Sequence, residues 1–153
     1  QLGIAAAEAQ ETIDAYFERY RGVRRFIDET VRRAKQQGYV TTLRGRRRYL
    51  PDLNSRNRTL RQAAERMATN TVVQGTAADL IKLAMIQVHQ ALNQESLRTK
   101  MLLQVHDELV FEVPPEEVEP MQGLVRSIME GVYALKVPLK VDVKTGANWA
   151  EVH

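Results

Sequence analysis

The sequence of 153 residues contains no cysteine, which excludes a disulfide scaffold, a zinc–thiolate site and catalysis by a thiol. It also lacks any apolar run near the roughly 20 residues that a membrane-spanning helix needs, so we expect no membrane association. Its first residues, Gln1-Leu2-Gly3-Ile4, are neither a basic leader nor an initiator methionine, and we expect a cut within a longer protein. With 44% hydrophobic and 27% charged residues, the composition is that of an ordinary folded domain, and the missing cysteine fits a reducing cytoplasm.

Charge is unevenly distributed, although the formal net charge is only +3. Between Arg44 and Arg66, eight arginines accompany two acids, a balance of +6; between Gln104 and Glu130, seven acids accompany one arginine, a balance of −6. The first stretch predicts a surface for a polyanion, because the arginine fork matches phosphate geometry. Two solvated surfaces remain the alternative.

Apolar residues at helical spacing predict a helix over 5–20 and a second one from 23, interrupted at Gly22 and ending at Gly38. Strand-like residues over 39–43 and 48–50 flank Arg44-Gly45, and we interpret them as a short hairpin.

The C-terminal part of the sequence alternates helical and strand patterns. A long helical pattern follows over 59–93, with an interruption expected around 72–75 because glycine weakens helices. Residues 101–105 and 108–113 predict two strands joined by a tight turn, 116–133 a helix and 139–143 a last strand. These elements predict an α+β fold, with helices packed on a small antiparallel sheet.

Three polar residues, His106-Asp107-Glu108, lie at the junction of the two expected strands. Such a turn can present the Asp107 carboxylate at a fixed point, and carboxylate oxygens suit Mg²⁺. One aspartate binds Mg²⁺ poorly without a second carboxylate and substrate phosphates. By spacing alone, the alternative that Asp107 is a turn residue satisfying nearby backbone N–H groups is the favoured one.

A second pattern is the spacing of Arg66, Asn70 and Gln74, which forms one polar stripe if the segment is helical. All three side chains donate hydrogen bonds, and such donors suit the minor-groove acceptors that all base pairs share. A solvated helix face explains the stripe equally well.

Three consecutive arginines, Arg46 to Arg48, follow Gly45 in the expected hairpin and could hold a phosphate backbone. Alternation along a strand directs Arg47 away from Arg46 and Arg48, so the three cannot all serve one ligand.

Taken together, these features resemble the family A DNA polymerases, the family of bacterial DNA polymerase I. Residues 42–52 look like the segment that joins fingers to palm, and 63–79 like the long palm helix. Residues 103–110 look like the family's motif C, and 146–149 like its C-terminal signature. The resemblance covers the whole chain and implies that 1–57 are the remainder of the fingers subdomain and 58–153 the C-terminal part of the palm.

The resemblance implies a DNA-directed DNA polymerase of replication and repair that joins a dNTP to a primer 3′-hydroxyl. Asp107 would be one of two aspartates that hold two Mg²⁺ ions, Glu108 a supporting acid, and His106 a neighbour of the primer terminus. We expect such an enzyme in the bacterial cytoplasm, with the nucleoid DNA.

The resemblance also implies contacts with primer–template DNA. Arg66, Asn70 and Gln74 would line the minor groove near the nascent base pair, and Arg48 would contact the primer strand.

The other metal-binding aspartate of the family and its nucleotide-binding fingers helix lie upstream and are missing from this sequence. We therefore expect the chain alone to be inactive and to need the N-terminal part of the polymerase as its partner. A non-catalytic nucleic-acid-binding module that uses only the arginines and the polar stripe is the alternative. A metal-dependent phosphohydrolase is a weaker one, because only His89 and His153 accompany His106.

Overall fold

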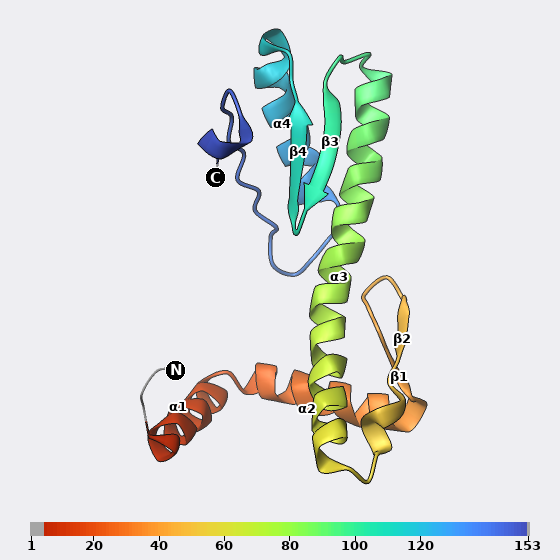
Figure 1. The fold of residues 1–153 in the computed structure, drawn as a ribbon, viewed down its shortest axis with the longest axis vertical. Coiled ribbons are helices and arrows are strands. Elements are labelled where there is room, and N and C mark those ends of the chain that lie inside the picture. Colours follow the sequence, from red (N-terminus) through yellow and green to blue (C-terminus); the bar gives the residue numbers. More distant parts are fainter. Residues whose placement is uncertain (1–4, 153) are drawn as a thin grey trace. The chain divides into compact units, whose positions relative to one another are not determined.

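The computed structural model describes residues 5–152, so the expectation about Gln1 to Ile4 lies outside the described residues. The chain divides into two compact units, one ending at Thr76 and the other beginning at Ala77. The boundary at 76/77 separates two compact units and does not test the division into fingers and palm at 57/58, which stays a prediction. The predicted α+β class is confirmed, since helices accompany two small antiparallel sheets (Figure 1).

The first unit begins with helices α1 (Ala6–Arg19) and α2 (Arg21–Gln37). The two helices were expected, but the break lies at Tyr20 (φ −110°, ψ 57°), and Gly22 lies inside α2. Gly22 lies in the first turn of α2, and the entropic cost of glycine applies chiefly to the middle of a helix. The predicted cap at Gly38 is confirmed, with φ 80° in the left-handed region that glycine adopts without strain.

Strands β1 (Tyr39–Thr41) and β2 (Arg47–Tyr49) form the expected hairpin, which we call the basic hairpin. The 3₁₀ turn η1 (Pro51–Asn54) follows it and leads into helix α3 (Arg58–Gln94). A small core forms under these elements, and alanines let α2 and α3 approach closely. Its buried members are Ala34, Val40, Leu50, Leu53, Ala64 and Ala68.

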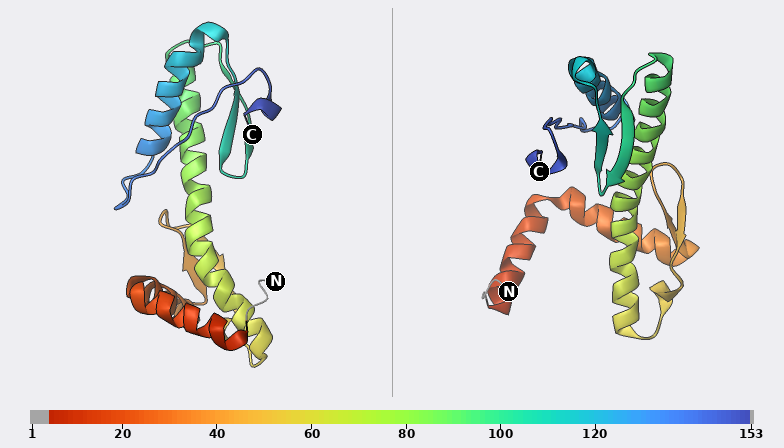
Figure 2. Two further views of the ribbon diagram at one scale, coloured as in Figure 1. Left: turned by 90° about the vertical axis from the view of Figure 1, so that its left-hand side faces the viewer. Right: turned by 45° about the horizontal axis from the view of Figure 1, so that its top comes forward.

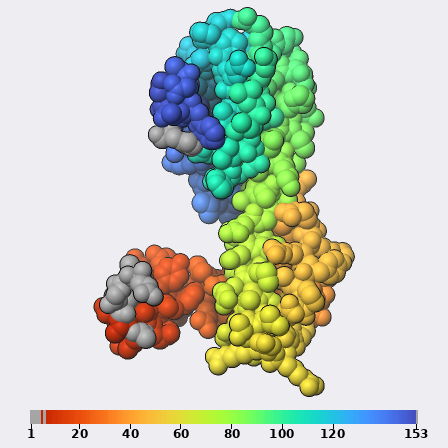
Figure 3. Space-filling model, viewed as in Figure 1, coloured from red at the N-terminus to blue at the C-terminus, as the bar shows by residue number. Residues whose placement is uncertain are grey.

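Helix α3 is continuous, so the predicted interruption over 72–75 is wrong. Gly75 lets the basic hairpin approach α3 closely, because a Cβ atom at this position would lie only 2.8 Å from Thr42 Cγ2 of the hairpin. Thr76 lies inside the helix, where it donates its hydroxyl to Val72 O (2.6 Å) and accepts from Leu43 N–H (3.1 Å). Figure 3 shows the orange atoms of the hairpin packed against the yellow-green atoms of α3.

The second unit contains the C-terminal part of α3 and the antiparallel strands β3 (Lys100–Val105) and β4 (Glu108–Glu112), as predicted. The 3₁₀ turn η2 (Pro115–Glu117) and helix α4 (Val118–Gly131) follow, and a further turn, η3 (Trp149–Glu151), lies near the C-terminus. Figures 1 and 2 show β3 and β4 beside α3 and α4. Their core contains Val88, Leu92, Met121 and Val125, with Phe111 of β4 packed against it.

Residues 139–143 are not a strand, so this prediction is wrong. Alternating apolar residues form a strand only where another strand accepts their backbone hydrogen bonds. In the described part of the chain, β3 and β4 pair only with each other, and Val141 N–H donates instead to Glu130 Oε1 (3.1 Å). Among the described helices, none has the length and apolar character to cross a membrane.

Candidate functional site

The turn between β3 and β4 consists of two residues, His106 and Asp107, because Val105 pairs with Glu108. His106 has φ 54°, in the left-handed region where histidine is among the more tolerated non-glycine residues. Gln104 Nε2 donates to His106 O and ties the turn back to β3. Such a short, hydrogen-bonded connection fixes where the Asp107 side chain begins.

All three polar residues of the turn, His106, Asp107 and Glu108, are exposed. The turn thus brings together the three predicted residues and presents two carboxylates. Oxygen donors of this kind suit Mg²⁺, so Asp107 fits a ligand position. A complete site needs more, and the described residues contain no cluster of three or more His, Cys, Asp or Glu side chains that could hold a metal.

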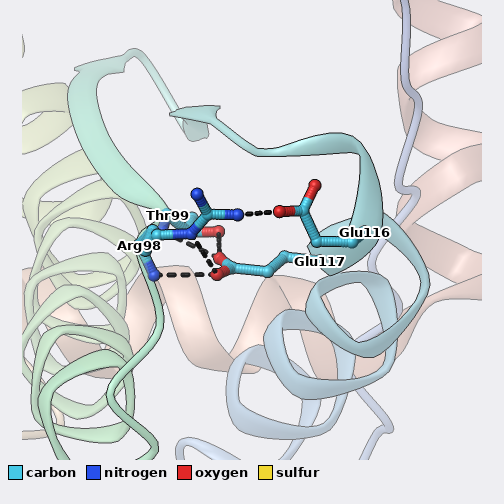
Figure 4. Close-up of polar contacts among 4 residues, drawn as sticks. All are labelled: Arg98, Thr99, Glu116 and Glu117. Atoms are coloured by element: carbon cyan, nitrogen blue, oxygen red, sulfur yellow. Dashed lines mark hydrogen bonds and ion pairs between the residues drawn. The ribbon is translucent and has the colours of Figure 1, made fainter.

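The open end of this β3–β4 hairpin, which we call the carboxylate hairpin, is closed by Glu117, and sequence reasoning missed this residue (Figure 4). One Glu117 oxygen accepts from Arg98 N–H (2.9 Å). The other accepts from Thr99 N–H (2.9 Å) and the Thr99 hydroxyl (2.6 Å). Arg98 also pairs with Glu116. Because Thr99 directly precedes β3 and Glu117 closely follows β4, the carboxylate joins both ends of the hairpin.

These hydrogen bonds change the acidity of Glu117, which is buried although glutamate is seldom buried without a partner. The hydroxyl of Thr99 and the N–H of Arg98 lower the pKa of the Glu117 carboxyl, and burial opposes them only in part. Glu117 is therefore charged at neutral pH. A glutamate two residues after a proline pair gives no sequence signal of this role.

The polar stripe lies on α3 in the first unit. Arg66, Asn70 and Gln74 are all exposed and repeat every fourth residue of an unbroken helix, so they share one face. Arg66 and Asn70 also line a groove of about 830 Å³ between α2 and α3. The Lys35–Glu65 ion pair (2.6 Å) lies in the same groove.

The three arginines of the basic hairpin separate as alternation predicts. Arg46 Nη2 donates to Gly75 O (3.0 Å), and Arg48 Nη1 donates to the hydroxyl of Thr71 (3.1 Å). Arg47 does neither; its guanidinium carbon lies 5.0 Å from the centre of the Tyr39 ring. Arg48 also contacts Met67 Sδ (3.6 Å). Met67 and Thr71 directly follow Arg66 and Asn70 in the chain, so Arg48 contacts α3 beside the polar stripe.

A family model for DNA polymerase family A matches residues 1–151. The chain belongs to this family. It is 55% identical to DNA polymerase I of Mycobacterium bovis over 149 residues, which cover 97% of the chain and 16% of that relative. It is 53% identical to DNA polymerase I of Bacillus caldotenax over 148 residues, 97% of the chain and 17% of the relative.

A solved structure, the POL domain of Pol1 from M. smegmatis in complex with DNA primer–template and dNTP, matches with a TM-score of 0.96 and 49% identity. The match covers 99% of the chain and 27% of that protein. The chain therefore has the fold of part of a polymerase domain, and it spans about a sixth of the length of the curated relatives.

Proposed function

We propose that the chain is part of a DNA-directed DNA polymerase that joins a dNTP to the 3′-hydroxyl of a primer. The observation that carries the proposal is the exposed Asp107 at a two-residue turn, in a chain that belongs to DNA polymerase family A. The matching structure contains primer–template and dNTP, and we propose that this protein binds the same ligands. Such an enzyme works where the chromosome lies, in the bacterial cytoplasm.

In this proposal Asp107 provides oxygen ligands for Mg²⁺, together with a second aspartate elsewhere in the longer protein. Two Mg²⁺ ions, when bound, supply charge neutralisation for the attacking oxygen and the leaving pyrophosphate. The short turn fixes the backbone from which the Asp107 side chain extends before substrate arrives, which reduces the reorganisation that the reaction requires. Glu108 adds negative charge beside it, and His106 approaches the primer terminus.

The exposed stripe of Arg66, Asn70 and Gln74 would contact the minor groove beside the new base pair. Donors at these positions meet acceptors that every base pair offers, so the contact depends on pair geometry and not on sequence. Arg48 of the basic hairpin would contact the primer strand beside this stripe, since Thr71 and Met67 hold its guanidinium against α3.

The chain alone is expected to be inactive. Mg²⁺ keeps near-octahedral oxygen coordination, and the Asp107 turn supplies only part of it. The remaining ligands and the residues that bind the dNTP would come from the rest of the polymerase. Primer extension by the isolated chain above background would contradict this part of the proposal.

The proposal is tested by Asp107→Ala in the intact protein, with single-turnover incorporation as the measurement. Loss of a carboxylate that holds the charge-neutralising metal is expected to slow incorporation by at least about 100-fold. Asp142→Ala, which removes another exposed aspartate of the same unit, is the matched control and should keep the parent rate. Unchanged incorporation in Asp107→Ala would overturn the catalytic assignment and favour a module that only binds nucleic acid.

A further inference from the structure

The outer face of the basic hairpin is not used by the proposed polymerase contacts. Arg46 and Arg48 are engaged with α3, whereas Arg47 belongs to the opposite face. On that face Tyr39 and Tyr49 pair directly across the two strands, and Thr41 pairs with Arg47. The hairpin therefore carries two tyrosines and an arginine together, on a face that α3 does not cover.

The aromatic side chains of this face are arranged for stacking. The ring centres of Tyr39 and Tyr49 are 5.5 Å apart with the planes at 58°, and Arg47 lies against the Tyr39 ring. Tyr49 is 68% exposed, although tyrosine has a large apolar ring. The contact with Tyr39 thus holds the Tyr49 ring in place, while most of the Tyr49 side chain stays open to a planar ligand.

Charge indicates what kind of ligand this is. Residues 39–49 contain four arginines and no acid. Helix α1 offers a comparison, because Tyr16 and Tyr20 also pair (4.9 Å) and Arg19 lies 5.9 Å from the Tyr20 ring. That helix, however, carries four acids, Glu8, Glu11, Asp14 and Glu18, which repel an anion. Of these two tyrosine pairs, the one on the basic hairpin combines an open ring with a positive field.

We propose that the Tyr39–Arg47–Tyr49 face is a binding site for single-stranded DNA. An unpaired base would stack on Tyr49, and Arg47 would contact the adjoining phosphate. Proteins bind single strands through such aromatic platforms in basic surroundings, since every base offers a planar face. Duplex DNA fits less well, because its bases are already stacked on one another. The proposal extends DNA binding beyond the polymerase contacts and does not depend on Asp107.

The test compares variants of the intact protein for binding of a fluorescein-labelled single-stranded oligothymidylate and of a blunt duplex of equal length. Tyr49→Leu keeps apolar bulk but removes the planar ring, and it is expected to weaken single-strand binding by at least about fivefold. Tyr49→Phe keeps the ring and should bind as the parent does. Arg47→Ala should reduce the slope of log K against log salt by about 0.7, the value for one phosphate of a single strand.

Tyr20→Leu is the matched control, because it removes an exposed, paired tyrosine from acidic surroundings and should leave single-strand binding unchanged. The proposal is overturned if Tyr49→Leu binds the oligothymidylate as tightly as the parent. It is also overturned if the variant weakens duplex binding by the same factor, because the face would then recognise backbone charge and not unpaired bases. Asp107→Ala should bind the oligothymidylate normally, which separates this proposal from the catalytic one.

Discussion

The basic hairpin and the carboxylate hairpin are both two-stranded, and they are stabilised by different means. An isolated two-stranded hairpin is marginally stable in water, so each must be held by its surroundings. The basic hairpin buries Val40 in an apolar core and is also held along its length by polar contacts with α3, through Leu43, Arg46 and Arg48. The carboxylate hairpin packs Phe111 on an apolar core, and Glu117 ties its open end.

The two hairpins differ in where their supporting contacts lie relative to their exposed residues. The basic hairpin has its contacts beside its arginines, so one face is engaged with α3 and the other remains open. The carboxylate hairpin has its polar tie at Thr99 and Glu117, at the end opposite the turn. The turn residues His106 and Asp107 are consequently left exposed at one end of the hairpin, while Glu117 holds the other end.

The largest expected effect on stability is at Leu53, one of the largest fully buried side chains and part of the core below the basic hairpin. Leu53→Ala should lower the free energy of unfolding of the first unit by about 2–5 kcal/mol, since it removes apolar contacts and leaves a cavity. Hydrogen exchange resolved by segment would measure this. Leu60→Ala, at a position 47% exposed, is the control and should change little. Equal loss of protection in the carboxylate hairpin would contradict separate stabilisation of the two hairpins.

A smaller effect is expected at Gly75, where the basic hairpin touches α3. Gly75→Ala places a Cβ atom against Thr42 Cγ2 and should destabilise the protein by about 1–3 kcal/mol, despite the better helix propensity of alanine. Gly123→Ala, in α4, should be neutral or stabilising, because nothing lies within 4 Å of the Cβ atom that alanine would add there. Thermal unfolding measures both. Thr42→Ser removes the contacting methyl group and should restore much of the stability of Gly75→Ala; failure to do so would refute the close-approach account.

The smallest expected change is in the hydrogen exchange of two backbone amides, those of Arg98 and Thr99. Both amides donate hydrogen bonds to the Glu117 carboxylate. Because folding lowers the pKa of Glu117, its stabilisation is complete above the pKa of glutamate in an unfolded chain, about 4.3. It is lost as pH falls through the lower pKa of the folded state. Exchange protection of these amides, corrected for intrinsic rates, should therefore fall in acid, whereas Glu117→Gln should show weaker protection without that step. If the exchange protection of these amides in the parent protein did not change with pH, their hydrogen bonds would not depend on the charge of Glu117.

Much of the fold follows from local patterns in the sequence. The cap at Gly38 and the two hairpins depend on residues close in the chain, and the structure confirms them. The glycine at position 75 of α3 accommodates Thr42, 33 residues away by chain position, so local propensity misreads it as a helix break. The irregular path over 139–143 has the same origin, because a strand requires a partner that its own sequence does not specify.

The turn and the helix that carry the candidate residues were predictable from the sequence, but the contacts that support them were not. The order of polar residues around Asp107 identifies the turn, and helical spacing identifies the stripe from Arg66 to Gln74. The tie between Glu117 and Thr99 joins residues that periodicity does not relate. The separation of Arg47 from its neighbours follows from strand alternation, but its position on Tyr39 depends on the register of the two strands.

We propose above that Asp107 holds metal in a polymerase active site. Its most direct test is a crystal structure of the intact protein with primer–template, a non-hydrolysable dNTP and Mn²⁺ in place of Mg²⁺. We expect an anomalous scattering peak within coordination distance of the Asp107 carboxylate, and loss of the peak in Asp107→Ala. Mn²⁺ bound at the dNTP with the Asp107 carboxylate directed away from it would contradict the claim.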